Sequence, residues 1–285
     1  MTNERNGILY MIIASASFAF MSLMVKLSGG TIPLFEQVFF RNLVMLAFSL
    51  WTMKQEGLSA AVDRPNRIPL FFRCLLGFLG VVSVFYANNH LPLADAQVLQ
   101  KLNPFFVILA AVLFLGERMS LPRLLTILTG FAGAVIIINP TGNFNLTPSL
   151  IGVASALFGG LAYVLIRRLA GRVHGIVIIF WFSLLSSLAS VPFMAAQFVW
   201  PTAAELLYLL LIGVFAALGQ YFITRSYLTA QATRVTLFDY TGVILSPILG
   251  YLVFQEQLAS RTILGTILII GSGIAASLLK DNRKL

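Results

Sequence analysis

Long apolar stretches separated by short polar segments run through the whole chain. Ten of these stretches have about the 20 residues that a helix needs to cross the hydrocarbon core of a bilayer. They cover residues 7–27, 34–53, 68–89, 93–115, 122–139, 149–168, 175–198, 204–226, 233–254 and 262–280. The longest connecting segment, at 55–67, is polar and leaves no room for a separate soluble domain. The pattern therefore predicts an all-α polytopic membrane protein with ten transmembrane helices.

The two halves of the chain resemble each other when one is shifted along the other by about 140 residues. The shift places ASFAFMSLMVKL (16–27) on LFGGLAYVLIRR (157–168). A repeat of five helices contains an odd number of crossings, so the second copy must be inserted upside down relative to the first. We therefore predict two inverted five-helix repeats, residues 1–141 and 142–285, an arrangement common among secondary transporters.

Composition supports the membrane class and argues against several others. The chain is 59% hydrophobic and 10% charged, whereas soluble domains carry about 25% charged residues. The net charge is +9, but the basic residues are scattered between apolar stretches. This scatter argues against a nucleic-acid partner and leaves the lipid bilayer as the expected one. The single cysteine, Cys74, excludes an intrachain disulfide, and no metal-ligand spacing occurs, so we expect no cofactor and no metal site.

The basic residues at the ends of the apolar stretches favour one side of the membrane. If the N-terminus is cytoplasmic, the outer side receives Lys26 and Arg261. The cytoplasmic side then collects fifteen basic residues: Arg5, Lys54, Arg64, Arg67, Arg73, Arg118, Arg123, Arg167, Arg168, Arg172, Arg225, Arg234, Lys280, Arg283 and Lys284. Because cytoplasmic loops of membrane proteins are enriched in Lys and Arg, we predict a cytoplasmic (inner) membrane protein with both termini in the cytoplasm.

Two cations remain inside the predicted spans, and Lys101 lies the deeper of the two. It falls near the middle of span 93–115, within ADAQVLQKLNPFF. Pro104 has no backbone N–H, so the carbonyl of Gln100 loses its helical partner beside the lysine. An ionisable residue at this depth indicates a substrate or ion site, and the alternative is a structural ion pair with a carboxylate inside the membrane.

Asp239 is an acidic residue about two turns into span 233–254. Under the repeat shift it aligns with Gln100, and Tyr240 aligns with Lys101, so both segments are expected to meet at one central cavity. Asp239 is interpreted either as a proton carrier or amine ligand, or as a counter-ion that neutralises Lys101 or Arg41. Burial and a neighbouring cation act on a carboxylate in opposite directions, so the sequence leaves these alternatives open.

Arg41 is the second cation inside a span, about two turns into the second helix. Its planar guanidinium suits a carboxylate or phosphate ligand, and the alternative is that it snorkels to the outer interface. Further polar and aromatic residues complete the candidate site, with packing or local hydrogen bonding as their alternative role: Gln97, Gln100, Asn103, Tyr86, Asn88 and Tyr240.

These features resemble the drug/metabolite transporter superfamily, specifically its EamA-type exporters. The resemblance rests on the ten spans in two halves, on LGER (115–118) with its counterpart FQEQ (254–257), and on ADAQVLQKLNPFF with its proline. It implies a membrane carrier of metabolites or drugs and covers essentially the whole chain. The small multidrug relatives bind cations through a glutamate in the first helix, whereas the first helix here, ILYMIIASASFAFMSLMV, has no acid.

The sequence also narrows the class of function. It shows no Ser/His/Asp grouping and no paired carboxylates, which argues against an enzyme. Two cations and one acid inside the spans favour an anionic or zwitterionic ligand. We therefore predict a secondary active transporter that works by alternating access and moves an organic acid or amino acid by export or exchange. The alternative is an exporter of hydrophobic cationic drugs. Proton coupling and the choice between a monomer and a homodimer stay open.

Overall fold

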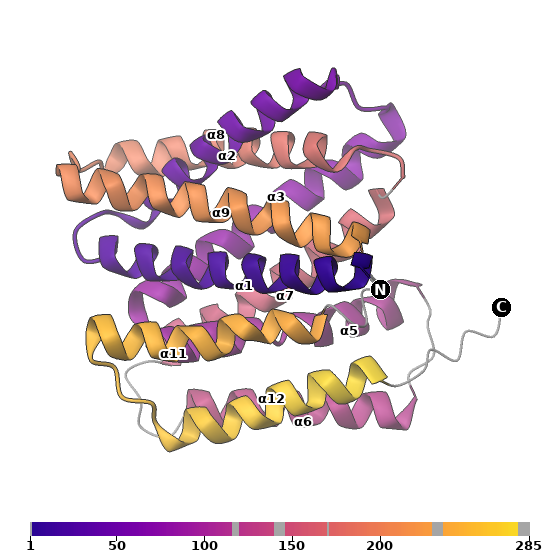
Figure 1. Ribbon diagram of the computed structural model, residues 1–285, viewed down its shortest axis with the longest axis vertical. Coiled ribbons are helices and arrows are strands. Elements are labelled where there is room, and N and C mark those ends of the chain that lie inside the picture. The colour runs from indigo at the N-terminus through magenta and orange to yellow at the C-terminus, as the bar shows by residue number, and fades with distance from the viewer. Residues whose placement is uncertain (1, 116–119, 140–145, 170, 230–235, 279–285) are drawn as a thin grey trace.

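The computed structural model describes residues 2–115, 120–139, 146–169, 171–229 and 236–278, which fold as a bundle of helices (Figure 1). The elements are α1 (Thr2–Ser28), α2 (Leu34–Glu56), α3 (Arg64–His90), α4 (Leu93–Gln100), α5 (Asn103–Leu115), α6 (Leu121–Ile138), α7 (Leu146–Leu169), α8 (Gly175–Ala196), α9 (Ala203–Thr229), the 3-10 helix η1 (Thr236–Tyr240), α11 (Thr241–Phe254) and α12 (Ser260–Leu278).

These elements confirm the ten predicted spans. Eight spans are single helices, while the fourth is divided into α4 and α5 and the ninth begins as η1 and continues as α11. Among the described residues, six helices are long and apolar enough by themselves to cross a membrane, and shorter apolar helices make up further spans. Many large apolar side chains face outward, including Leu113, Ile68 and Trp200, as expected for a surface that contacts lipid.

The helix contacts follow the symmetry of an inverted repeat. Helix α1 packs on α9, α3 packs on α7, α2 packs on α8, and α6 packs on α12 at one edge of the bundle (Figure 1). In a five-helix repeat, spans 1 to 5 correspond to spans 6 to 10. The contact between spans 1 and 8 (α1–α9) therefore corresponds to the contact between spans 6 and 3 (α7–α3). The α5–α7 contact corresponds in the same way to the α11–α1 contact, and the α2–α8 and α6–α12 contacts correspond to themselves. The predicted fold class is therefore confirmed, and the division at residues 141 and 142 stays a prediction.

Glycine allows the closest of these approaches, between α6 and α12. A Cβ atom added to Gly133 would lie 2.8 Å from the carbonyl oxygen of Gly265, and one added to Gly265 would lie 2.6 Å from that of Gly133. Close backbone contact through small residues is a principal way in which helices associate in lipid, where burial of apolar surface gives no net advantage.

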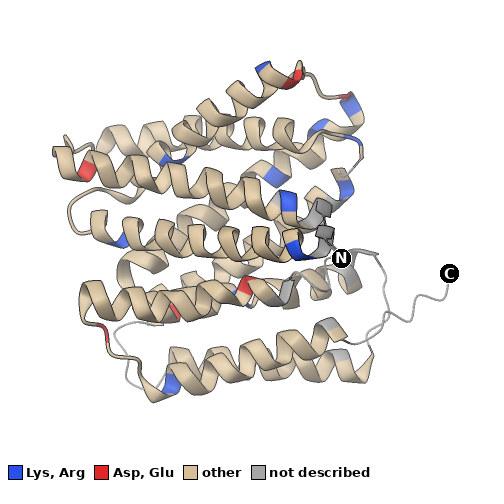
Figure 2. Cartoon of the chain, viewed as in Figure 1, with Lys and Arg blue, Asp and Glu red and all other residues tan. Residues whose placement is uncertain are grey.

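The charged residues are unevenly distributed along the bundle (Figure 2). Basic residues gather at the end that carries the N-terminus and the α2–α3 connection, and few lie at the opposite end. Lys26, near the end of α1, and Arg261, near the start of α12, belong to that opposite end. The arrangement agrees with a cytoplasmic N-terminus, which stays a prediction.

Cysteine labelling tests this orientation. In a Cys74→Ala background, Ser59→Cys and Arg172→Cys should react with an impermeant maleimide only after the cytoplasmic face is exposed, because both residues lie in exposed connections at the basic end. Gly30→Cys is the matched control, because a side chain there meets open space in the α1–α2 connection and should be labelled in intact cells. Labelling of Ser59→Cys from outside would contradict the predicted orientation.

Candidate functional site

The fourth span is interrupted at Lys101. Helix α4 ends at Gln100 and α5 begins at Asn103, so Lys101 and Leu102 form the turn between them. The Lys101 N–H donates to the carbonyl of Val98 at 2.9 Å, which is the shorter bonding pattern of a 3-10 turn. Pro104 follows in the first turn of α5, where its missing N–H is tolerated. The proline therefore has the effect predicted from the sequence, since the helix breaks beside the lysine.

The ninth span is interrupted at a matching place. Within the described part of this span, η1 is a 3-10 helix that contains Asp239 and Tyr240, and regular α-helix begins at Thr241. The Thr241 hydroxyl donates to the carbonyl of Phe238 at 2.7 Å, which satisfies a backbone acceptor at the junction. Each half of the chain therefore contributes one irregular segment with an ionisable residue.

Lys101 and Asp239 meet across the two interruptions. The ammonium Nζ lies 2.5 Å from Asp239 Oδ2 and 3.1 Å from the carbonyl oxygen of Asp239. It also lies 5.9 Å from the centre of the Tyr240 ring. The side chains retain 16% and 30% of their exposure, so the pair is sheltered but reachable. The interpretation of Asp239 as a counter-ion for Lys101 thus agrees with the structure, whereas Asp239 does not contact Arg41.

Helix α1 holds this region through hydroxyl groups. Ser15 Oγ donates to the carbonyl of Asp239 at 2.5 Å and accepts from the Gly242 N–H at 2.8 Å, which fixes the end of η1. Ser22 lies two turns further along α1. It accepts from Gln97 Nε2 at 2.6 Å and from Asn88 Nδ2 at 3.1 Å. Gln97 therefore bonds to α1 and not to the lysine amine.

The other predicted site residues occupy several different surroundings. The Gln100 Nε2 atom is buried without a hydrogen-bond partner among the described residues. Asn103 packs against α7, where a Cβ on Gly159 would lie 2.6 Å from its Nδ2. Tyr86 stacks on His90 with ring centres 4.1 Å apart, in the last turns of α3. Tyr240 is largely buried, and its hydroxyl lies against Gly273 of α12.

Arg41 lies in a separate place, between α2, α3 and α8. Its side chain is 6% exposed, so the alternative that it snorkels to the interface is wrong. It shares the ring of Phe182 with Arg73, which is 7% exposed. Arg73 was grouped with the cytoplasmic basic residues from the sequence, and its side of the membrane stays a prediction. Its burial between helices was not predicted, although Arg73 is the sixth residue of the predicted span 68–89.

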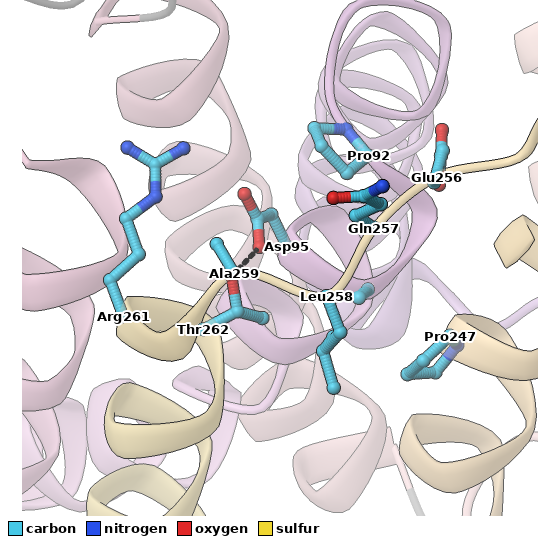
Figure 3. A pocket seen from close by; sticks show the side chains of 10 residues that line it. Pro92, Asp95, Pro247, Glu256, Gln257, Leu258, Ala259, Arg261 and Thr262 are labelled. Atoms are coloured by element: carbon cyan, nitrogen blue, oxygen red, sulfur yellow. Dashed lines mark hydrogen bonds between the residues drawn. The ribbon is translucent and has the colours of Figure 1, made fainter.

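The end of the bundle opposite the N-terminus is tied together by a second set of polar contacts. Lys26 forms an ion pair with Glu256 and donates to the carbonyl of Leu91 at 2.6 Å, while Glu256 accepts from the Leu93 N–H at 2.9 Å. Beside them, Asp95 accepts from the Thr262 hydroxyl at 2.6 Å (Figure 3). These contacts join α1, the α3–α4 connection and α4 to the segment between α11 and α12.

A cavity at this end has a volume of about 80 Å³ and is lined by Asp95, Glu256, Arg261 and their neighbours (Figure 3). Pockets for small metabolites measure about 300–1,000 Å³, so this one has room for a few water molecules only. The described residues contain no group of three side chains that could hold a metal ion.

The comparisons with known proteins agree with this architecture. The model of the EamA-like transporter family matches the chain twice, over residues 5–139 and 146–278. Two proteins from Pseudomonas aeruginosa strains, both described as the pseudopaline exporter CntI, are 37% identical over 278 residues and match over 97% of each chain. A riboflavin transporter of Rhizobium johnstonii is 32% identical over 272 residues, which are 94% of this chain and 89% of its own. One solved crystal structure, 22% identical, shares the fold with a TM-score of 0.68 over 97% of this chain and 98% of its own.

The bundle and its internal charged groups thus define a multi-pass membrane transporter. The chain belongs to the EamA-like transporter family, and the resemblance seen in the sequence is confirmed. It is a secondary transporter of metabolites and not an enzyme.

A mutant cycle tests whether Lys101 and Asp239 act as a unit. Lys101→Met leaves a carboxylate without its partner and should lower the stability of the folded protein by about 1–3 kcal/mol, less than for a fully buried pair because both side chains are partly exposed. Adding Asp239→Asn should recover most of this loss, since no unpaired charge remains. Thermal unfolding in detergent measures both effects.

Lys54→Met is the control, because Lys54 is exposed at the end of α2 and its loss should change stability by less than about 0.5 kcal/mol. A double variant whose loss equals the sum of the two single losses would show that the two side chains are energetically independent.

Proposed function

We propose that the protein exports a small zwitterionic or anionic metabolite, an organic acid or amino acid, by alternating access around the Lys101–Asp239 pair. The observation that carries this proposal is the pair itself. It joins the two interrupted spans, is neutral as a unit and keeps part of its surface accessible.

A zwitterion can replace both partners of the pair at once. Its carboxylate takes the place of Asp239 beside the Lys101 ammonium, and its own ammonium takes the place of Lys101 beside Asp239. Each charge then keeps a partner, so opening the pair does not leave an ion isolated in a medium of low polarity. The unpartnered Gln100 amide, next to Lys101 in sequence, and the Asn88 carbonyl oxygen of α3 are further hydrogen-bonding groups for a polar solute.

An anionic solute places a different demand on the pair. If it occupies Lys101 alone, Asp239 is left without a cation, and taking up a proton removes that cost. Proton coupling is then a consequence of the ligand's charge. A hydrophobic cation should bind less well at this site, because its binding at Asp239 would leave Lys101 unpaired beside a second positive charge.

The ion pair of Lys26 and Glu256 supports alternating access. It joins α1 of the first half to the segment after α11 of the second half at one end of the bundle, so access from that end requires it to open. We take this end to be the outer one, with both termini cytoplasmic. Rocking of one repeat against the other around a central site is the usual way in which inverted repeats work.

The relatives support the direction of transport. The two proteins at 37% identity are described as exporters, whereas a relative from Rickettsia bellii, described as an S-adenosylmethionine uptake transporter, is 25% identical over 268 residues. The more similar relatives therefore favour export.

Flux measurements in proteoliposomes test the proposal. A thermal-shift panel of amino acids, organic acids and organic cations first selects the cargo, and counterflow of the labelled cargo then measures transport. Lys101→Met should lower the binding affinity for a cargo with a carboxylate by about 10- to 150-fold, which is the effect of losing one hydrogen bond to a charged group. Asp239→Asn should abolish uphill transport driven by a pH gradient and retain exchange at equal pH if the carboxylate carries the proton.

Lys54→Met serves again as the control and should transport normally. Selection of organic cations alone by the panel, or normal transport of a carboxylate by well-folded Lys101→Met protein, would contradict the proposed substrate class.

A further inference from the structure

Two arginines on neighbouring helices are buried together without an acid. Arg41 on α2 and Arg73 on α3 retain 6% and 7% of their exposed surface. The ion pairs found among the described residues, Lys26 with Glu256 and Lys101 with Asp239, involve neither of them. This part of the bundle therefore holds two like charges that repel each other.

One aromatic ring brings the two guanidinium groups together. The Phe182 ring of α8 has the Arg73 guanidinium 4.3 Å and the Arg41 guanidinium 5.7 Å from its centre. Gly77 makes room for this arrangement, because a Cβ there would lie 2.5 Å from Arg73 Nη1 and 2.9 Å from Phe182 Cε2. Contact with the face of a ring offsets only part of the cost of burying a cation.

Three guanidinium nitrogens of Arg41 and Arg73 have no hydrogen-bond partner among the described residues. Arg41 Nη1 donates to Asn42 Oδ1 at 2.9 Å, and Asn42 in turn donates to the carbonyl of Val38 at 2.8 Å, which fixes that side chain on α2. Arg41 Nε and both Nε and Nη1 of Arg73 are buried with no hydrogen-bond partner among the described residues. Buried donors are nearly always satisfied in folded proteins, so the vacant ones indicate a ligand that accepts hydrogen bonds.

We propose that Arg41 and Arg73 form a carboxylate-binding site, separate from the Lys101–Asp239 pair, for an anionic solute. A carboxylate lowers the net charge of the two arginines from +2 to +1, and its oxygens accept from the planar forks of both guanidinium groups. This inference rests on the proposed function only for the role of the ligand as cargo. We take one solute to reach both this site and the Lys101–Asp239 pair, so the preferred solute carries more than one carboxylate.

Thermal unfolding of the purified full-length protein tests the site, with acetate, succinate and citrate as probes at constant ionic strength. Succinate or citrate should raise the unfolding temperature more than acetate does. Arg41→Met and Arg73→Met should each weaken the apparent affinity for the effective probe by about 10- to 150-fold. Arg73→Lys retains the charge but loses the planar fork, and should give a smaller loss in a protein that remains well folded.

Arg225→Met is the matched control. Arg225 also lies over an aromatic ring, that of Tyr221 at 5.4 Å, but it is exposed, so its replacement should leave the response to carboxylates unchanged.

The proposal is overturned if none of the three carboxylates stabilises the protein, or if the arginine variants respond as the wild type does. It is also overturned if chloride or phosphate at the same concentration gives an equal shift that disappears in the same variants, because the site would then bind anions without regard to the carboxylate group. Counterflow of a zwitterion with a single carboxylate reports the proposed function independently. If that flux depends on Lys101 while the arginine variants keep the carboxylate response, this inference alone fails.

Discussion

A charge inside a membrane needs a partner, and both ion pairs among the described residues join one half of the chain to the other. Lys101 of the first half pairs with Asp239 of the second, and Lys26 pairs with Glu256. The two arginines of the first half share Phe182 of the second. Each polar contact therefore stabilises one arrangement of the halves, and any movement between them must exchange these partners for others.

This constraint connects structure with transport. A contact between the halves that closes one end has to open when the site is exposed to that end, and a ligand with suitable charges lowers the cost of opening. The Lys26–Glu256 pair joins the two halves at one end of the bundle, whereas the Lys101–Asp239 pair lies where both spans lose regular helix. The turn at Lys101 and the 3-10 turn at Asp239 allow the side chains to meet without straining a continuous helix, and they leave backbone groups near a polar ligand.

The sequence predicted those features that depend on the residues of a single helix or on the internal repeat. Hydropathy located the ten spans because the thickness of the bilayer sets their length. The missing N–H of Pro104 located the break beside Lys101, and the internal repeat aligned the segments of Lys101 and Asp239 that meet in space. These inferences require no knowledge of how each helix is rotated about its axis.

Rotation and neighbour contacts explain what the sequence did not predict. The sequence counted Arg73 among the cytoplasmic basic residues without regard to its depth, and its burial against Phe182 depends on how α3 faces α8. Tyr86 belongs to a stack with His90, and Asn103 packs on the glycines of α7, and both contacts depend on which neighbour each helix face meets. Ser22, which collects the amides of Gln97 and Asn88, is one of many serines in the sequence and carries no distinguishing pattern.

In the proposed transport cycle, cargo separates Lys101 from Asp239 by replacing each as the other's partner. Electron cryomicroscopy of the protein in nanodiscs, with and without a saturating cargo selected by thermal shift, measures this directly. We expect the distance of 2.5 Å between Lys101 Nζ and Asp239 Oδ2 to be retained without cargo. With cargo, the two atoms should separate beyond 4 Å, the limit of a direct ion pair, with density for the ligand between them. An intact pair beside a ligand bound elsewhere in the bundle would contradict the account.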